Sequence, residues 1–253
     1  MLNILKILFL FHISYYSYGK NDLVIFAPAS LYNGLENTIA KFKEKNNFEI
    51  KAVYLGTSSL ARQIKLGAKP DIFISANEYW MNHLEDKNLV LENYTFFFLY
   101  NDLVLITNEN SDIKKPFNTI EEMKAVLVES RKKLSLAMVD SVPAGIYGKK
   151  VLMEIGLWDS IKKNTVQTAN VRAALNLVVR KELDFGLVYS SDTVLNNKVK
   201  VLFNFKNVMK EKIIYPVTIL NEKILTLNFY NYLKIEETKN IMTKWGFRIE
   251  SRD

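Results

Sequence analysis

Small polar residues follow several apolar runs of this chain, at places where a strand would pass into a helix. Ser30, Thr57, Ser58 and Tyr189 carry hydroxyl groups at such places. Hydroxyl and backbone N–H groups donate hydrogen bonds without bearing a charge, which suits an oxyanion removed from water. The sequence therefore predicts a site for a small anion in the loops formed by residues 27–30, 56–59, 141–147, 170–171 and 189–191.

Catalysis by these hydroxyl groups is not expected. A hydrolase or transferase that used one of the serines would need a neighbouring base. His83 lies on a different predicted helix, where it is expected at the surface, and no Lys lies near Ser30 or Thr57. Arg172 is the nearest cation to any of the loops. Neutral donors cannot relocate a proton, so a binding protein is predicted rather than an enzyme.

The first of these loops is positioned by a strand and a helix. Residues 23–26 form an unbroken apolar run, and Leu31, Leu35, Ile39 and Phe42 then recur at helical spacing. Ser30 stands where an N-cap is expected. A helix start presents unpaired N–H groups and the positive end of the helix dipole, so it can hold an anion.

The same strand–loop–helix arrangement recurs along the chain, which predicts parallel sheets of an α/β fold. Further strands are expected at residues 48–54, 72–74, 134–139 and 185–189, and C-terminal helices are expected to end near Gly246. The apolar stretch 94–107 is either a hairpin or one long strand passing between two lobes, and the crossing is favoured. Residues 213–219 predict a second crossing strand, with Pro216 at an edge or a bend.

Composition is that of an ordinary globular protein. The 253 residues are 49% hydrophobic and 24% charged, and the net charge of +7 comes from Lys spread along the chain. Such a spread favours solvated helix faces over a nucleic-acid groove, and no zinc-finger or helix-turn-helix pattern is present. The absence of Cys excludes disulfides, thiolate metal sites and a lipid-anchoring cysteine.

The N-terminus has the pattern of an export signal. Lys6 stands within an apolar run, and the small residues Ser17 and Gly19 are spaced as at a signal-peptidase site. We predict a signal peptide at residues 1–19, cleaved after Gly19, and a periplasmic mature protein of charge +7 − 1 = +6. The alternative is a buried N-terminal helix or strand.

Seven short motifs, in order, resemble those of the periplasmic molybdate-binding proteins of ABC importers. The resemblance extends from Asp22 to Ile249. The motifs are FAPASL at 26–31, SLARQI at 59–64, PDIFISAN at 70–77, VPAGIYGK at 142–149, NVRAAL at 170–175, GLVYSSD at 186–192 and YPV at 215–217.

This resemblance implies the two-lobed, type II-like periplasmic binding protein fold, with two βα lobes joined by two crossing strands. Lobe 1 would comprise residues 20–101 and 216–253, and lobe 2 residues 102–215. The ligand would be molybdate or tungstate, with no other cofactor or metal. The implied ligand groups are the hydroxyls of Ser30, Thr57 or Ser58, and Tyr189, and the backbone amides of Ala144 and Val171.

Two positions depart from the family pattern. Pro28 replaces a small Ala and removes one backbone N–H beside Ser30. Thr57 replaces a Ser: its hydroxyl can still donate, but its methyl group could tighten the pocket, or Ser58 could be the ligand instead. Asp71 is expected to be structural because a carboxylate would repel an oxyanion, and Trp80, Trp158 and Trp245 are expected as core anchors.

The resemblance also implies partners. An ABC permease and its ATPase would receive the ligand from a monomeric binding protein, and no nucleic acid is expected. Two other hypotheses stay open from the sequence: a binding protein for another tetrahedral oxyanion such as sulfate, and a ligand-sensing module of a regulator or chemoreceptor.

Overall fold

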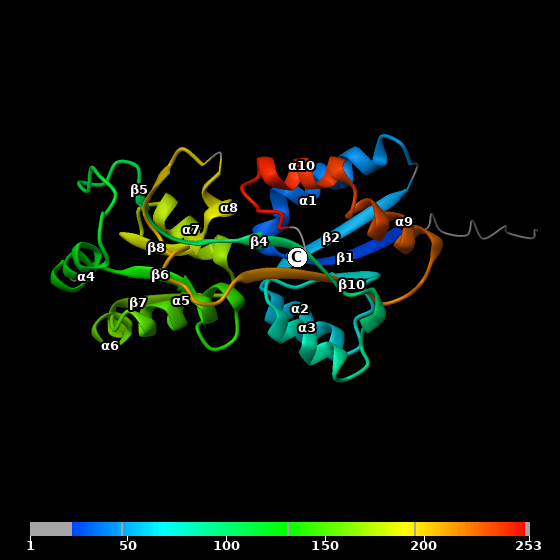
Figure 1. The fold of residues 1–253 in the computed structure, drawn as a ribbon, viewed down its shortest axis with the longest axis horizontal. Helices are drawn as coiled ribbons and strands as arrows, with labels where there is room; N and C mark the ends of the chain where they lie inside the picture. The colour runs from blue at the N-terminus through cyan, green and yellow to red at the C-terminus, as the bar shows by residue number, and fades with distance from the viewer. Residues whose placement is uncertain (1–21, 47, 131, 195, 251–253) are drawn as a thin grey trace, which may run out of the picture.

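The computed structural model describes residues 22–46, 48–130, 132–194 and 196–250. Two lobes lie side by side, and each is built on its own five-stranded sheet (Figure 1). The predicted signal peptide lies outside the described residues. No helix in the described part of the chain is both long enough and apolar enough to cross a membrane.

The first sheet has the strand order β2-β1-β3-β10-β4. Its strands are β1 (Asp22–Pro28), β2 (Glu49–Leu55), β3 (Ile72–Ile74), β4 (Phe96–Asn101) and β10 (Ile213–Ile219). The first three are parallel, as the alternation of strands and helices predicts, and β10 is antiparallel to both of its neighbours. The carboxyl ends of β1 and β2 therefore meet at one edge, where ligands collect in such sheets.

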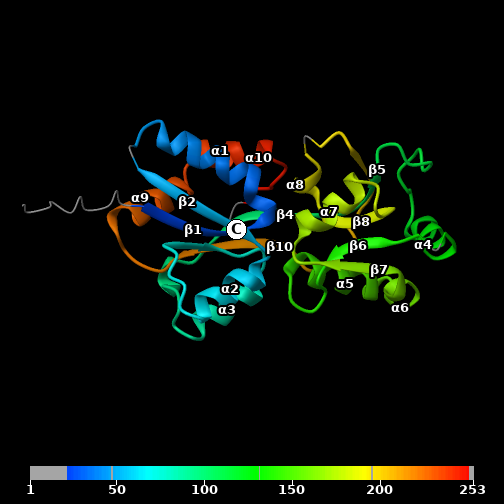
Figure 2. The same cartoon turned by 180° about the vertical axis from the view of Figure 1, so that it is seen from behind.

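Helices cover both faces of the first sheet. α1 (Tyr32–Lys43) and α10 (Glu236–Lys244) lie on one face, and α2 (Thr57–Lys65) and α3 (Glu78–Glu85) on the other (Figures 1 and 2). α9 (Ile224–Tyr232) packs near the end of β10. The predicted stop at Gly246 is confirmed, since this glycine follows α10 with φ +80°.

The second sheet repeats the pattern with the order β7-β6-β8-β5-β9. β6, β7 and β8 are parallel, and β5 runs antiparallel to β8. α5 and α6 lie on one face and α7 on the other (Figure 2). The strands are β5 (Leu103–Asn108), β6 (Leu134–Ala137), β7 (Thr165–Thr168), β8 (Phe185–Tyr189) and β9 (Val199–Asn204); the helices are α4 (Ile120–Glu129), α5 (Pro143–Glu154), α6 (Trp158–Ile161), α7 (Val171–Val179) and α8 (Ser190–Thr193).

The first predicted crossing between the lobes is made by two consecutive strands, β4 and β5. β4 belongs to the first sheet and β5 to the second, with only Asp102 between them, so the crossing is confirmed and the hairpin is excluded.

The second predicted crossing strand is wrong in position. All of β10 pairs within the first sheet, starting with Ile213 opposite Asn101, so the chain returns between Asn204 and Ile213. Residues 213–215, which the predicted division gave to lobe 2, therefore pair in the first sheet. Pro216 lies in an interior strand, and the register shift beside it is the predicted bend.

The tryptophans pack at the margins of the cores. Trp158 and Trp245 are half-buried against the larger apolar cluster, and Trp80 against the smaller one. Three strands differ from the prediction. β7 and β9 were not predicted, and β6 ends two residues earlier than expected. Thr165, Gln167 and Thr168 in β7 give no apolar run, because this edge strand is only half-buried.

Candidate functional site

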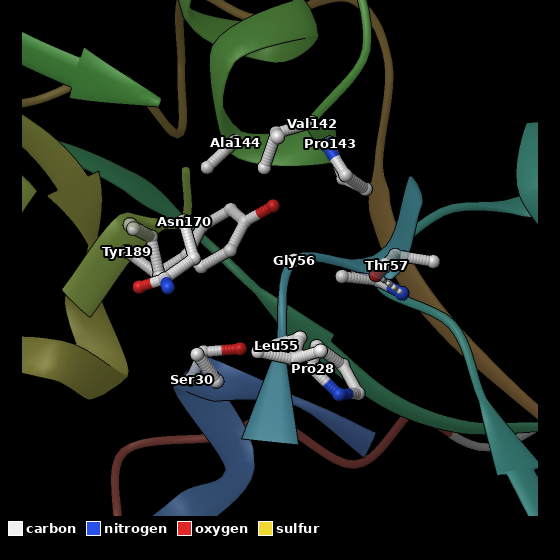
Figure 3. Close-up of a pocket in the computed structure, with 13 residues that line it drawn as sticks. Pro28, Ser30, Leu55, Gly56, Thr57, Val142, Pro143, Ala144, Asn170 and Tyr189 are labelled. Atoms are coloured by element: carbon white, nitrogen blue, oxygen red, sulfur yellow. Dashed lines mark hydrogen bonds between the residues drawn. The ribbon is translucent and has the colours of Figure 1, made fainter. Parts of the chain in front are cut away.

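Helix starts from both lobes converge on one pocket between them (Figure 3). The pocket is small, with a cavity volume of about 10 Å³. This is close to the least space that one water molecule needs, so any larger guest requires the lining groups or the lobes to move apart. Five of the six predicted ligand residues line the pocket: Ser30, Thr57, Ala144, Val171 and Tyr189.

Ser30 is not the N-cap that its position predicted. Residues Ala29–Leu31 form a short 3₁₀ segment before α1, and no side-chain cap is made at its start. The buried Ser30 hydroxyl instead lies 2.9 Å from the Tyr215 hydroxyl of β10. Pro28, the last residue of β1, also lines the pocket and supplies no N–H there.

Thr57, rather than Ser58, faces the pocket. Both residues are buried in the first turn of α2, but Ser58 does not line the cavity. The backbone N–H of Ala76 donates to Thr57 Oγ1 at 3.2 Å. An N–H group can only donate, so the Thr57 hydroxyl keeps its own hydrogen for another acceptor.

The second lobe contributes two backbone amides. Ala144 lies in the first turn of α5 and Val171 is the first residue of α7. The first N–H groups of a helix have no acceptor within the helix, and they carry the positive end of its dipole. Asn170 caps α7 by accepting the N–H of Ala173 at 3.0 Å, so this cap does not use the N–H of Val171, a residue that lines the pocket.

Tyr189 brings the second-lobe hydroxyl to the pocket from the end of β8. It is 1% exposed, and its hydroxyl has no hydrogen-bond partner among the described residues. Burial raises the pKa of Tyr189 well above its ordinary value, and the nearby Tyr215 acts in the same direction. The hydroxyl is therefore a neutral donor whose missing partner would be a guest in the pocket.

Arg172 is close to the pocket, but its charge is compensated. Its Nε lies 2.6 Å from Oδ1 of the buried Asp192, and the other oxygen of this carboxylate, Oδ2, accepts the N–H of Tyr189 at 3.2 Å. Burial raises the pKa of Asp192 to about 6, and the charge of Arg172 opposes that shift. Arg172 Nη2 also donates to the carbonyl of Ser30 at 3.4 Å, across the interface between the lobes.

Other polar groups have structural roles away from the pocket. Asp71 accepts hydrogen bonds from Lys223 and Asn221 at 2.8 Å and from the N–H of Val24 at 2.7 Å, as expected of a structural carboxylate. His83 is half-buried beside Tyr79 and Trp80, not freely exposed, and does not line the pocket. In the described part of the chain no three His, Asp or Glu residues are placed to hold a metal ion.

The two lobes contact each other at two further points. Trp80 Nε1 in α3 donates to the carbonyl of Ser141 in the second lobe at 2.7 Å. A Cβ added to Gly56 would lie 2.6 Å from the carbonyl oxygen of Ala169, so the two backbones meet there with no room for a side chain. The structure is thus that of a closed pair of lobes.

Comparison with known proteins assigns this chain to a family. The sequence profile of the bacterial extracellular solute-binding proteins matches residues 23–248. The chain belongs to that family. The molybdate-binding protein ModA of Escherichia coli is 33% identical over 233 residues, which cover 91% of this chain and 90% of that protein. ModA of Haemophilus influenzae is 31% identical over 230 residues, or 89% of each chain.

A solved structure agrees with the fold. The periplasmic molybdate-binding protein of Azotobacter vinelandii superposes with a TM-score of 0.77 at 18% identity, over 90% of this chain and 100% of that one. The predicted resemblance and the predicted two-lobed α/β solute-binding fold are therefore confirmed.

Two polar residues beside the pocket were not predicted. Tyr215 contacts Ser30, and Asn101 contacts Tyr215 through a 3.3 Å hydrogen bond. Their signal in the sequence is polarity inside an apolar strand: Asn101 and Asp102 are the only polar pair within the apolar stretch 96–106. That signal marks an unusual position but not its partner, because residues 101 and 215 are brought together only by the pairing of β4 with β10.

Proposed function

We propose that this protein captures molybdate or tungstate between its lobes and delivers it to an ABC permease and its ATPase. The observation that supports this most directly is the buried Tyr189 hydroxyl, which has no partner among the described residues and lines a pocket of neutral donors. Relatives named as molybdate-binding proteins, which align over about nine tenths of the chain, support the choice of ion.

The proposed ligand groups are the hydroxyls of Ser30, Thr57 and Tyr189 and the amides of Ala144 and Val171. Ser58 becomes the weaker alternative to Thr57, because it does not line the pocket. These groups can donate to a tetrahedral dianion from both lobes. Arg172, paired with Asp192, would add little net charge at the ion. Charge compensation would come instead from helix starts and hydrogen bonds.

Transport would follow from closure of the lobes on the ion and release at the permease. We place the mature protein in the periplasm as a monomer, after removal of residues 1–19, and assign it no catalytic reaction. The pocket lining supports a binding role because it includes no His, Lys or carboxylate side chain that could serve as a base.

Calorimetric titration of the purified mature protein with molybdate, tungstate, sulfate and phosphate tests this function. Molybdate and tungstate should bind tightly with a stoichiometry of one, and sulfate and phosphate much more weakly. Tight binding of sulfate with no response to molybdate would instead identify a sulfate-binding protein. Co-purification with a receptor kinase in place of a permease would identify a sensing module.

A further inference from the structure

A chain of buried hydrogen bonds leads from the crossing strand to the pocket. Asn101, the last residue of β4, donates from Nδ2 to the Tyr215 hydroxyl at 3.3 Å, and the Tyr215 and Ser30 hydroxyls are 2.9 Å apart. All three side chains are buried, at 2% exposure or less. Neither Asn101 nor Tyr215 lines the pocket itself.

The orientation of the Asn101 amide is fixed by its neighbours. The backbone N–H groups of Asp102 and Ser191 point at Oδ1, at 3.0 and 3.4 Å. An N–H group can only donate, so the amide oxygen must face these two groups and the NH₂ must face Tyr215. The amide therefore reaches Tyr215 as a donor.

This orientation sets the direction of the next two bonds. The Tyr215 oxygen accepts from Asn101, which leaves its own hydrogen free for Ser30 Oγ. Ser30 then accepts at that oxygen and keeps its hydrogen for the pocket. In the reverse direction, the buried Tyr215 hydrogen would have to turn to the nearby Tyr189 hydroxyl, which makes no hydrogen bond in this structure, so this direction is less favourable.

We propose that Asn101 and Tyr215 are positioning residues that hold the Ser30 hydroxyl as a donor toward the bound oxyanion. The site then accepts guests whose oxygens carry no hydrogen and rejects protonated ones, such as hydrogen phosphate, at the Ser30 position. Asn101 also bonds to Ser190 and Ser191, directly after Tyr189, so the same side chain contacts both lobes at the crossing. The inference rests on the proposed function, since it concerns the same pocket.

Asn101→Asp reverses the relay with little change of shape. The new carboxylate can only accept, so Tyr215 would donate to it and Ser30 would donate to Tyr215, presenting a lone pair to the anion. Added negative charge would also weaken binding, so it must be separated from the relay. A double-mutant cycle with Ser30→Ala does this, because the charge acts in both backgrounds and the relay acts only when Ser30 is present.

Molybdate affinity of the full mature protein is measured by calorimetry, with circular dichroism to check folding. We expect Asn101→Asp to weaken binding at least about tenfold when Ser30 is present, and by about threefold or less in the Ser30→Ala background. Tyr215→Phe should show the same dependence on Ser30. Tyr230→Phe, which removes a buried hydroxyl bonded to Tyr94 O at 2.6 Å, is the matched control and should leave the affinity unchanged.

Competition by hydrogen phosphate at mildly alkaline pH gives a second readout. Asn101→Asp should lower the ratio of molybdate affinity to hydrogen phosphate affinity, since charge affects both dianions alike. Equal loss of molybdate affinity in both Ser30 backgrounds would overturn the inference while leaving the proposed function intact. If the folded wild type binds only tungstate or sulfate, the cycle is run with that ion. If it binds none of them, both proposals are wrong.

Discussion

The two halves of the pocket are built on the same sheet pattern but prepare their donors differently. In each lobe three parallel strands are followed by an antiparallel one, and helices start beyond the parallel strands. In the first lobe, Thr57 accepts the N–H of Ala76 and Ser30 contacts Tyr215. In the second lobe, the Tyr189 hydroxyl has no partner among the described residues.

This difference divides the work of binding. The protein already orients the donors of the first lobe, so they can select the ligand with little further loss of conformational entropy. The buried Tyr189 hydroxyl lacks a hydrogen-bond partner, and a bound oxyanion would supply one. This hydrogen bond would stabilise the closed, ligand-bound state. Selection therefore belongs mainly to the first lobe, and the gain from closing belongs mainly to the second.

Preventing the halves from meeting should have the largest effect. Gly56→Ala would place a Cβ 2.6 Å from the Ala169 carbonyl oxygen, and the lobes would have to stay apart. We expect a loss of up to about 3 kcal/mol of molybdate binding with little change in stability. In Gly148→Ala the new Cβ meets Leu187 and Leu136 within one lobe, so stability should fall and affinity should not. Equal affinity losses in the two variants would contradict this account.

The buried carboxylate of the second lobe should be visible in the pH dependence of stability. Burial raises the pKa of Asp192 from 3.8 to about 6, so the native state binds this proton more tightly than the unfolded state. The contribution to stability is present below pH 3.8 and is lost as pH rises to about 6, by up to about 3 kcal/mol. Urea unfolding across this range should show that loss in the wild type and not in Asp192→Asn.

Asp159→Asn removes an exposed acid of α6 and serves as the control, with an expected pH profile like that of the wild type. If the wild type and Asp192→Asn have parallel profiles, the proton on Asp192 does not distinguish the folded state from the unfolded one.

Removing each hydroxyl separately tests the comparison most directly. Ser30→Ala and Tyr189→Phe should each weaken molybdate binding by about 2 kcal/mol, because each removes a donor to a charged oxygen. Their effects on the ligand-free protein should differ. Tyr189→Phe removes an unpartnered buried group and should leave stability unchanged or raised, whereas Ser30→Ala breaks the contact with Tyr215 and should cost about 1 kcal/mol.

Chemical unfolding without ligand, together with calorimetry, measures both quantities for each variant. A fall in stability in Tyr189→Phe equal to that in Ser30→Ala would mean that the second-lobe hydroxyl is as well satisfied as the first.

The smallest effect is expected at the edge of the interface. Trp80→Phe removes the bond from Nε1 to the Ser141 carbonyl and should weaken molybdate binding by about 1 kcal/mol through loss of closure. Trp158→Phe, within the second lobe, should change stability more than affinity. Unchanged affinity in Trp80→Phe would mean that this bond also persists when the lobes are open.

Much of the fold could be predicted because it depends on local pattern. Apolar runs located β1, β3 and β8. The half-polar edge strand β7 was not predicted, because a half-buried strand has no continuous apolar run. The position at which the chain returns to the first lobe was also predicted wrongly, because an apolar strand is compatible with either sheet until its partner strands are known.

By itself, the sequence determined that hydroxyls and helix starts stand after parallel strands, that cations are scarce among them, and that Asn101 interrupts an apolar stretch. Only the tertiary structure decided that Ser30 contacts Tyr215 instead of capping α1, that Thr57 and not Ser58 faces the pocket, and that Asp192 pairs with Arg172. The reason is physical. Residue type and spacing decide which groups a chain can offer, whereas the partners of a buried polar group are supplied by strands far apart in the sequence.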